Sequence, residues 1–302
     1  MADTFKQPAL ATAKRAPSAP WRVVIYGILI GGAVLSVLPF IYMLMTSLKS
    51  YGSVINNTFW PWPPFGNEMP QFNNFAEAIQ AVGMDTTWHI PLFFRYLANS
   101  LIVSSAIIVG VLVTSTLAAY ALANMDIPGK HVIFLILLAT IMIPQDLVIV
   151  PKAVMMFDLK WYNTYLALIV PFLASVFGIF LLRQFFRQIP RDLFDAAVMD
   201  GAGHTRYLFS IVVPLSKSAL ITVALMHFIW SWDEFRWPLL VTKDASMRVL
   251  AVGLQQFMQG EGGTNVQLLM AFATIVVMPI LLFYFFTQQY FTVSIISTGI
   301  KR

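Results

Sequence analysis

Six long apolar stretches separate the polar segments of this chain, and they restrict its possible folds more than any other feature. They cover approximately residues 23–48, 97–123, 132–150, 164–186, 215–240 and 268–291. A helix of about 20 apolar residues is long enough to cross the hydrocarbon core of a bilayer, and it satisfies its backbone hydrogen-bonding groups internally. The pattern therefore predicts an all-α polytopic membrane protein with six transmembrane helices.

The composition agrees with a membrane protein and argues against several kinds of chemistry. Hydrophobic residues make up 58% of the 302 residues and charged residues only 11%, whereas soluble domains carry about 25% charged residues. The chain has no cysteine, and none of its four histidines pairs with another at metal-ligand spacing. A phosphate-binding loop has a glycine five residues before its Gly-Lys pair, but Asn124 occupies that position before Gly129-Lys130. We therefore expect that this chain does not hydrolyse ATP and binds no cofactor or metal itself.

The distribution of positive charge predicts the side of the membrane on which the chain ends lie. Six spans place both ends on one side. With the N-terminal end inside, the inner segments hold twelve Lys and Arg residues and the outer segments hold seven. Because cytoplasmic loops are enriched in Lys and Arg, we predict that both termini are cytoplasmic. The positive net charge then requires no nucleic-acid partner.

The same pattern divides the chain into four parts. Residues 1–20 are polar and rich in Ala and Pro, which predicts a disordered cytoplasmic tail. Residues 21–95 hold the first transmembrane helix and a long periplasmic loop, and that helix is too long for the roughly 7–15 apolar residues of a signal peptide. Residues 96–292 form a core of five further helices, and residues 293–302 form a cytoplasmic tail.

A polar segment at residues 190–214, PRDLFDAAVMDGAGHTRYLFSIVVP, interrupts the apolar C-terminal two thirds of the chain. Leu193 and Ala197 fall on one helical face, and Gly201 can adopt the left-handed conformation that ends a helix. A second short amphipathic piece follows. We predict two short helices broken at Gly201, and we call residues 190–214 the elbow. A compact helical elbow has a suitable shape to lie in the groove of another protein.

The elbow resembles the EAA signature of ABC-importer permeases, EAA-x3-G-x9-I-x-LP. The matching positions are Asp195-Ala196-Ala197, Gly201, Ile211 and Val213-Pro214. Asp195 stands where Glu is usual and Val213 where Leu is usual, so the acidic and the apolar character are both kept. The resemblance implies that the elbow is the coupling helix, which docks on an ATP-binding subunit.

About residues 20–302 resemble the second permease subunit of carbohydrate ABC importers of the maltose-transporter type. The matching segments are TSLK at 46–49, NSL at 99–101, AAYALAN at 118–124, IPGK at 127–130, NTY at 163–165, FLLRQFF at 180–186, WDEF at 232–235 and GIK at 299–301. WNEF is the commoner form of the seventh segment, so Asp233 departs from it. The resemblance implies the type I ABC importer permease fold in a bacterial cytoplasmic (inner) membrane, with a core of the ABC transmembrane type-1 kind.

The resemblance also implies an assembly. The chain is expected to pair with a homologous second permease subunit above two copies of a cytoplasmic ATP-binding subunit, which hold ATP and Mg²⁺. A periplasmic or lipid-anchored solute-binding protein docks on the opposite side. The expected function is ATP-driven import of a sugar or oligosaccharide by alternating access, without enzymatic activity in this chain.

Three groups of residues are candidates for functional sites. The predicted ATPase contact consists of Asp195, Ala196, Ala197, Gly201, Ala202, Tyr207, Leu208 and Phe209. The predicted substrate pathway consists of Gln145, Asp146, Trp230, Trp232, Asp233 and Glu234, since ionisable groups at membrane depth are usually functional and aromatic faces suit sugar rings. The predicted binding-protein contact is the loop with Gly260, Glu261, Gly262 and Gly263.

Each group has a plainer interpretation. Asp195 can be a solvated acid in the first turn of a helix, and the tryptophans can be anchors at the membrane interface. The glycine-rich loop can be a surface turn. His227 is expected to be a packed polar residue rather than a ligand.

Two alternative functions remain open from the sequence. The solute can be a sugar derivative, such as glycerol 3-phosphate or a sulfonated glycoside. In a different class, the chain can be an ion-coupled secondary transporter that uses Asp233 or Glu234 as its proton site.

Overall fold

The computed structural model describes residues 19–63, 66–257 and 265–289. Within these ranges every regular element is a helix, and the only strand-like pairing is an isolated bridge between Met84 and Pro91. The all-α prediction is therefore confirmed for the described part of the chain.

Among the described residues, four helical segments without a sharp bend are long and apolar enough to cross a membrane. They are α1 (Ala19–Ser47), α4 (Leu92–Asn124), the run of α7 (Tyr165–Ile169), η1 (Val170–Phe172) and α8 (Val176–Phe186), and α15 (Val266–Thr287). Two further pairs of helices satisfy the same test only when each bent pair is taken as one span, which gives up to six spans.

The third predicted span, residues 132–150, is not one straight helix. The chain forms α5 (Lys130–Ile141) and α6 (Gln145–Asp158), which meet at a bend of 95°. Pro144 lies directly before α6 and cannot donate a backbone hydrogen bond. Proline also disfavours the helical conformation of the residue before it, so the break falls between Met142 and Pro144.

The fifth predicted span, residues 215–240, is also interrupted. The helical run His204–Leu215 meets α12 (Lys217–Asp233) at a bend of 78°, and the chain leaves α12 before α13 (Arg236–Val241) begins. Glu234 stabilises this second break, because its Oε1 accepts hydrogen bonds from the backbone N–H groups of Arg236 (2.8 Å) and Trp237 (3.1 Å). A carboxylate is well suited to these free donors at the first turn of a helix.

The core is built around α4, which packs against α8 and α12. Gly178 of α8 allows the close approach, since a Cβ atom there would lie 2.7 Å from Oγ of Ser115 on α4. A second cluster joins α4, α12 and α15 with α3 (Asn73–Ala81) and α14 (Leu250–Gln256) through residues such as Tyr96, Trp232 and Phe272. By contrast, α1 keeps its apolar side chains on the surface.

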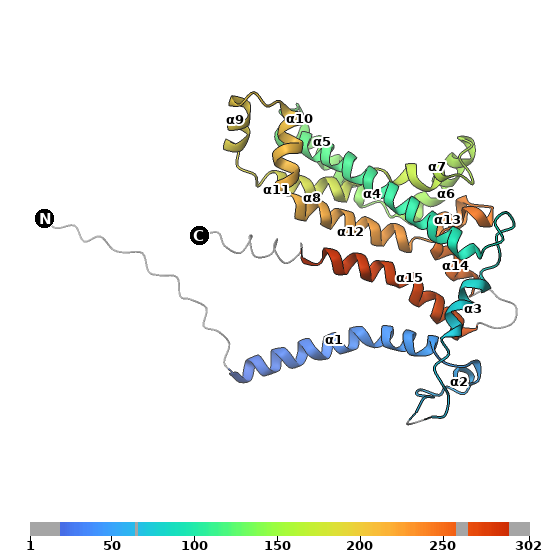
Figure 1. Cartoon of the computed structure of the whole chain (residues 1–302). Helices are drawn as coiled ribbons and strands as arrows, with labels where there is room; N and C mark the ends of the chain where they lie inside the picture. The colour runs from blue at the N-terminus through green and yellow to red at the C-terminus, as the bar shows by residue number, and fades with distance from the viewer. Residues whose placement is uncertain (1–18, 64–65, 258–264, 290–302) are drawn as a thin grey trace.

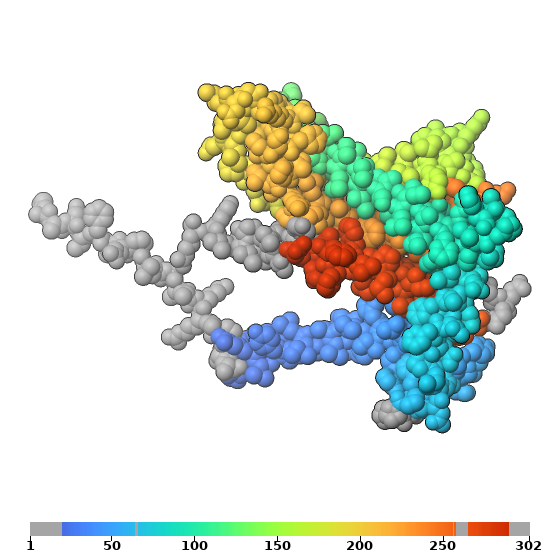
Figure 2. All heavy atoms as spheres, viewed as in Figure 1, coloured from blue at the N-terminus to red at the C-terminus, as the bar shows by residue number. Residues whose placement is uncertain are grey.

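The elbow and the loops lie at opposite ends of this bundle. Figure 1 places α9 (Asp192–Met199) and α10 (His204–Tyr207) at the end where α1 begins and α15 ends. In Figure 2 the same segment stands out as a lobe. At the other end lie α2 (Tyr51–Ile55), α3, α13 and α14, and η3 (Ala245–Met247) directly precedes α14 in the chain.

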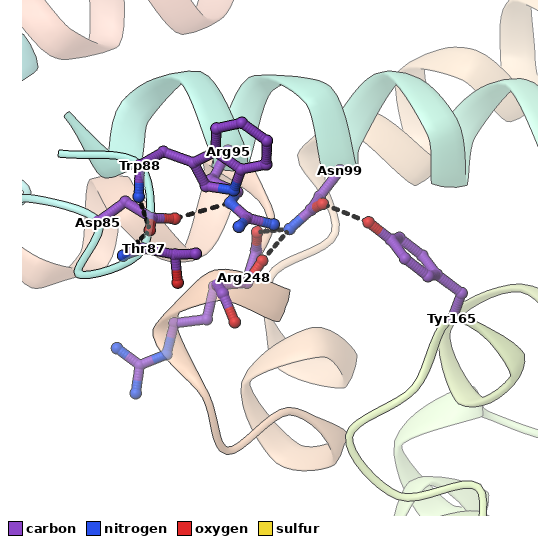
Figure 3. A network of polar contacts seen from close by, with 8 residues as sticks. Asp85, Thr87, Trp88, Arg95, Asn99, Tyr165 and Arg248 are labelled. Atoms are coloured by element: carbon purple, nitrogen blue, oxygen red, sulfur yellow. Dashed lines mark hydrogen bonds and ion pairs between the residues drawn. The ribbon is translucent and has the colours of Figure 1, made fainter. Parts of the chain in front are cut away.

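Buried polar side chains fasten this loop end to α4 (Figure 3). Asn99 donates hydrogen bonds of 2.8 Å to the carbonyl oxygens of Ser246 and Arg248, and its Oδ1 accepts one of 2.6 Å from Tyr165. Nearby, Arg95 forms an ion pair of 2.7 Å with Asp85. The second span was predicted to begin at about residue 97, but α4 begins at Leu92. Asn99 therefore lies two turns inside α4, and its side chain joins this helix to α7 and to the segment before α14.

Candidate functional site

The elbow consists of four short helical pieces. After α9 and α10 come the π-helical turn η2 (Leu208–Val212) and α11 (Val213–Leu215). Gly201 separates α9 from α10 with φ +76°, and nothing lies within 4 Å of where its Cβ would be. The predicted break at Gly201 is therefore present, and glycine is needed for the backbone conformation rather than for space.

The end of the elbow is bent. The fifth apolar stretch was predicted as one span from residue 215, but Pro214 and Leu215 belong to α11, and the 78° bend follows at Ser216. Because α11 continues the helical run from His204, Pro214 lies inside helical backbone, where its missing N–H removes one hydrogen bond. The π-helical turn just before it is of a kind often found at functional sites.

One face of the elbow is part of the protein core. Ala197, Tyr207 and Leu208 are at most 6% exposed and belong to the cluster that includes residues of α4, α8 and α12. Nδ1 of His204 lies 2.8 Å from the hydroxyl of Tyr120 on α4, and the ring of Phe194 stacks on the imidazole at 5.2 Å. Aromatic contacts and a hydrogen bond thus hold both elbow helices against α4.

The opposite face of the elbow is open to solvent. Asp195, Ala196 and Gly201 are exposed, Met199 is 88% exposed and Phe209 is 57% exposed. Ala202 is half-buried. Of the eight residues predicted to contact an ATPase, the three that point into the core are therefore not available to a partner in this conformation. The motif spacing identified the elbow but did not separate its two faces.

A second candidate site is a cavity of about 490 Å³ where three helices break or end. It lies between the end of α5, the start of α6, the junction of η1 with α8, and α12. Its lining includes Thr140, Gln145, Phe172, Ser175, His227 and Trp230. Two of the predicted pathway residues, Gln145 and Trp230, thus line the same space, and breaks in spanning helices are typical of transport sites.

Charged side chains adjoin this cavity at the junction of α6 and α13. Asp146 and Arg236 form an ion pair of 2.6 Å. Glu234 and Lys152 line the same small hollow as that pair, and the ammonium of Lys152 lies 4.7 Å from the ring centroid of Phe172. Lys152 was not predicted as a site residue from the sequence. It follows Gln145 by seven residues, or two helical turns, and therefore lies on the same face of α6.

The remaining predicted pathway residues are placed differently. Trp232 is only 1% exposed, and its indole N–H donates a hydrogen bond of 2.9 Å to the carbonyl of Val276, so it packs in the core and does not reach the cavity. Asp233 is exposed at the end of α12 and does not line the cavity. The loop Gly260–Gly263 lies outside the described residues.

Within the described ranges, no group of three or more His, Asp or Glu residues is arranged to hold a metal ion. His227 is half-buried, and its Nδ1 lies 2.9 Å from the carbonyl of Val223. His204 is engaged by Tyr120 in the elbow.

Comparison with known proteins decides the family. The family model described as "Binding-protein-dependent transport system inner membrane component" matches residues 84–296, which include α4, the elbow and both bent helix pairs. The chain belongs to this family. The resemblance inferred from the motifs is thereby confirmed, and the chain is an inner-membrane permease component.

Relatives of this permease cover nearly its whole length. It is 31% identical over 265 residues to a putative ABC transporter permease protein, ORF2, of Caldicellulosiruptor sp. (strain Rt8B.4), covering 87% of this chain and 91% of the relative. It is 31% identical over 272 residues to the sn-glycerol-3-phosphate transport system permease protein UgpE of Brucella abortus (strain 2308), covering 90% and 94%. The arabinooligosaccharides transport system permease protein AraQ of Halalkalibacterium halodurans is 29% identical over 269 residues, covering 89% and 92%.

The fold of the permease is also found in a solved structure. A chain from a bacterial ABC transporter involved in the import of the acidic polysaccharide alginate matches with a TM-score of 0.77 and 23% identity, covering 92% of this permease and all of that chain. At this identity the match establishes the fold alone, which agrees with the expected ABC importer permease fold.

Proposed function

We propose that this chain is one of two permease subunits of an ATP-driven, binding-protein-dependent importer and that its elbow couples ATP hydrolysis to transport. The observation that supports this most directly is the two-sided elbow. Its inner face is continuous with the core of α4, α8 and α12, while Asp195, Met199 and Phe209 are exposed on the other face. A partner that moves the exposed face therefore moves the bundle with it.

The coupling follows from rigid packing. When two ATP-binding subunits close around ATP, a helix seated in a groove on their surface shifts with them. Because the rings of Phe194, His204 and Tyr120 are in contact in turn, the shift passes from α9 to α4 as a rigid-body motion. The permease then alternates between two packings, and ATP and solute each bias that equilibrium.

We place the elbow and both chain ends in the cytoplasm. The excess of Lys and Arg in the inner segments favours this orientation, and the elbow lies at the same end as the start of α1 and the end of α15. The opposite end, with α2, α3 and α14, then faces the solute-binding protein. Exposed apolar residues of α5 and α6, such as Leu135 and Leu147, provide a surface for lipid or for the second permease.

The proposed solute is a sugar, an oligosaccharide or a sugar derivative. The names of the relatives support this class, since they include permeases for arabinooligosaccharides and for sn-glycerol 3-phosphate. ATP and Mg²⁺ belong to the partner subunits in this proposal, and the permease itself performs no catalysis.

Purification tests the assembly. The chain, expressed together with the proteins encoded beside it, should co-elute with an ATP-binding subunit and a second permease. In liposomes the complex should hydrolyse ATP faster when the loaded solute-binding protein is added. A chain that purifies alone and moves solute along an ion gradient would contradict the proposal and favour a secondary transporter.

A further inference from the structure

The cavity between α5, α6, α8 and α12 holds polar groups that the protein itself leaves available. Gln145 is exposed, and its amide makes no hydrogen bond with any described residue. Nδ1 of His227 lies 2.9 Å from the carbonyl of Val223. A carbonyl only accepts, so Nδ1 carries the proton, and in the neutral imidazole Nε2 is an acceptor.

Ser175 adds a further polar group to the same wall. Its Oγ accepts a hydrogen bond of 3.1 Å from the backbone N–H of Gly178, at the start of α8. The hydroxyl proton is still available for donation, since a hydroxyl donates once and accepts twice. Donors and an acceptor therefore lie around one space, as hydroxyl-rich ligands require.

The aromatic side of the cavity is formed by Trp230 and Phe172, whose ring centroids lie 4.9 Å apart. Trp230 is half-buried, so part of its indole ring is accessible. The face of an aromatic ring is electron-rich, and it attracts the weakly positive C–H groups that cover one face of a sugar ring. A partly apolar cavity with a few convergent polar groups is the usual form of a small-ligand site.

The charges beside the cavity offset one another. Arg236 is paired with Asp146 at 2.6 Å. Lys152 lies over the rings of Phe172 and Trp237, and Glu234 lines the same hollow. Among the described residues that line the cavity and the adjoining hollow, two cations thus face two carboxylates. Two positive and two negative side chains leave this region without net charge, so it gives a phosphate or carboxylate group no electrostatic preference over an uncharged group.

We propose that this cavity is a saccharide subsite contributed by this chain and that it takes an uncharged sugar ring. The ring lies on Trp230, and its hydroxyl groups bind Gln145, Ser175 and His227. The inference rests on the proposed function, because it assumes that solute passes between the permease subunits. It assigns the importer to neutral saccharides and not to acidic solutes such as glycerol 3-phosphate.

Uptake by the reconstituted complex tests the substrate class. Liposomes that hold the whole importer would be supplied with the solute-binding protein, ATP and one labelled solute. The panel contains neutral arabino-, xylo- and malto-trisaccharides, sn-glycerol 3-phosphate and an alginate trisaccharide. We expect ATP-dependent uptake of at least one neutral saccharide and none of the two acidic solutes.

Uptake of an acidic solute, or of no neutral saccharide, overturns the inference while the ATPase-coupled assembly still stands. A complex without an ATP-binding subunit overturns the proposed function instead.

Substitutions test the subsite itself. Trp230→Ala should raise the half-saturating solute concentration about five- to tenfold, whereas Trp230→Phe keeps a ring face and should stay within about twofold. Trp21→Ala removes an exposed tryptophan at the start of α1 and should change nothing. If Trp230→Ala does not assemble, Gln145→Ala, at an exposed position, serves in its place with an expected rise of about threefold. An unchanged half-saturating solute concentration in the Trp230→Ala variant refutes the subsite. If that variant does not assemble, the same result in the Gln145→Ala variant refutes it.

Discussion

The hydroxyl of Tyr120 lies 2.8 Å from Nδ1 of His204, so a hydrogen bond joins the last turns of α4 to the elbow. The phenol ring also lies 5.9 Å from the imidazole, which in turn stacks on Phe194 of α9. This contact connects the elbow to α4, the longest of the spanning helices in the described part of the chain.

Removing this hydrogen bond should loosen the coupling without unfolding the protein. Tyr120→Phe keeps the ring and loses a bond worth about 1 kcal/mol. We expect the number of ATP molecules hydrolysed per solute imported to rise, by up to about fivefold. The measurement is simultaneous ATPase and uptake assays in liposomes. Tyr51→Phe, at an exposed position on α2 at the opposite end, is the control, and an equal rise in both variants would argue against a role for His204.

Gly201 should tolerate substitution only as far as its backbone conformation allows. Its φ of +76° costs a residue with a Cβ about 1–2 kcal/mol, so Gly201→Ala should reduce coupled transport several-fold. Gly201→Pro should abolish it while the protein still inserts, because proline fixes φ near −65°. Gly203 has φ −81° and open space around it, so Gly203→Ala should transport normally. Unimpaired transport by Gly201→Pro would contradict the role of the elbow.

Asn99 should make a large contribution to stability at the loop end. Its side chain is 2% exposed and makes three hydrogen bonds, to Ser246, Arg248 and Tyr165 (Figure 3). Asn99→Ala removes all three hydrogen bonds at this part-buried site and should cost about 2–3 kcal/mol, measured as a lower thermal midpoint in detergent. Asn73→Ala, at an exposed position on α3, should shift the midpoint little. A similar shift in both would show that the Asn99 network contributes no special stability.

Asp85 should make stability depend on pH at the acidic end. Backbone N–H groups of Thr87 and then Trp88 donate to its carboxylate, and with Arg95 they lower its pKa. Because the pKa is lowered on folding, this contribution is complete above the unfolded value of about 3.9 and is lost as the pH falls through the folded value. Thermal midpoints between pH 6 and pH 3 should fall more steeply in the natural chain than in Asp85→Asn. Identical curves would show that this site does not contribute.

The sequence predicted the number and place of the apolar stretches well because hydropathy is a local property. It did not reveal the break between α5 and α6, since the residues up to Ile143 continue the apolar run and only Pro144 signals the break. Glu234 was assigned to a span, but its carboxylate binds the backbone at the start of α13. That role depends on tertiary geometry and has no signal in composition.

The two sites show the same limit at the level of single residues. Trp230 and Trp232 were grouped by their proximity in sequence, yet two residues along a helix point to nearly opposite sides, and only Trp230 lines the cavity. In the elbow, Ala197 and Tyr207 match the expected segment but face the core. Which face of a short helix packs inward depends on the neighbouring helices, and that information is absent from a motif.

The central claim is that the exposed face of the elbow contacts a cytoplasmic ATP-binding subunit, and thiol cross-linking tests it most directly. The chain has no cysteine, so Met199→Cys introduces a unique thiol at a position that is 88% exposed on α9. Met69→Cys, at a methionine that is 72% exposed in the loop between α2 and α3, is the matched control.

We predict that the thiol of the Met199→Cys variant reacts with a membrane-impermeant maleimide only in permeabilised cells and cross-links to the ATP-binding subunit. The thiol of the Met69→Cys variant should react in cells whose cytoplasmic membrane is intact and give no such product. Labelling of the Met199→Cys variant from outside, or its failure to cross-link in the assembled complex, would contradict the account.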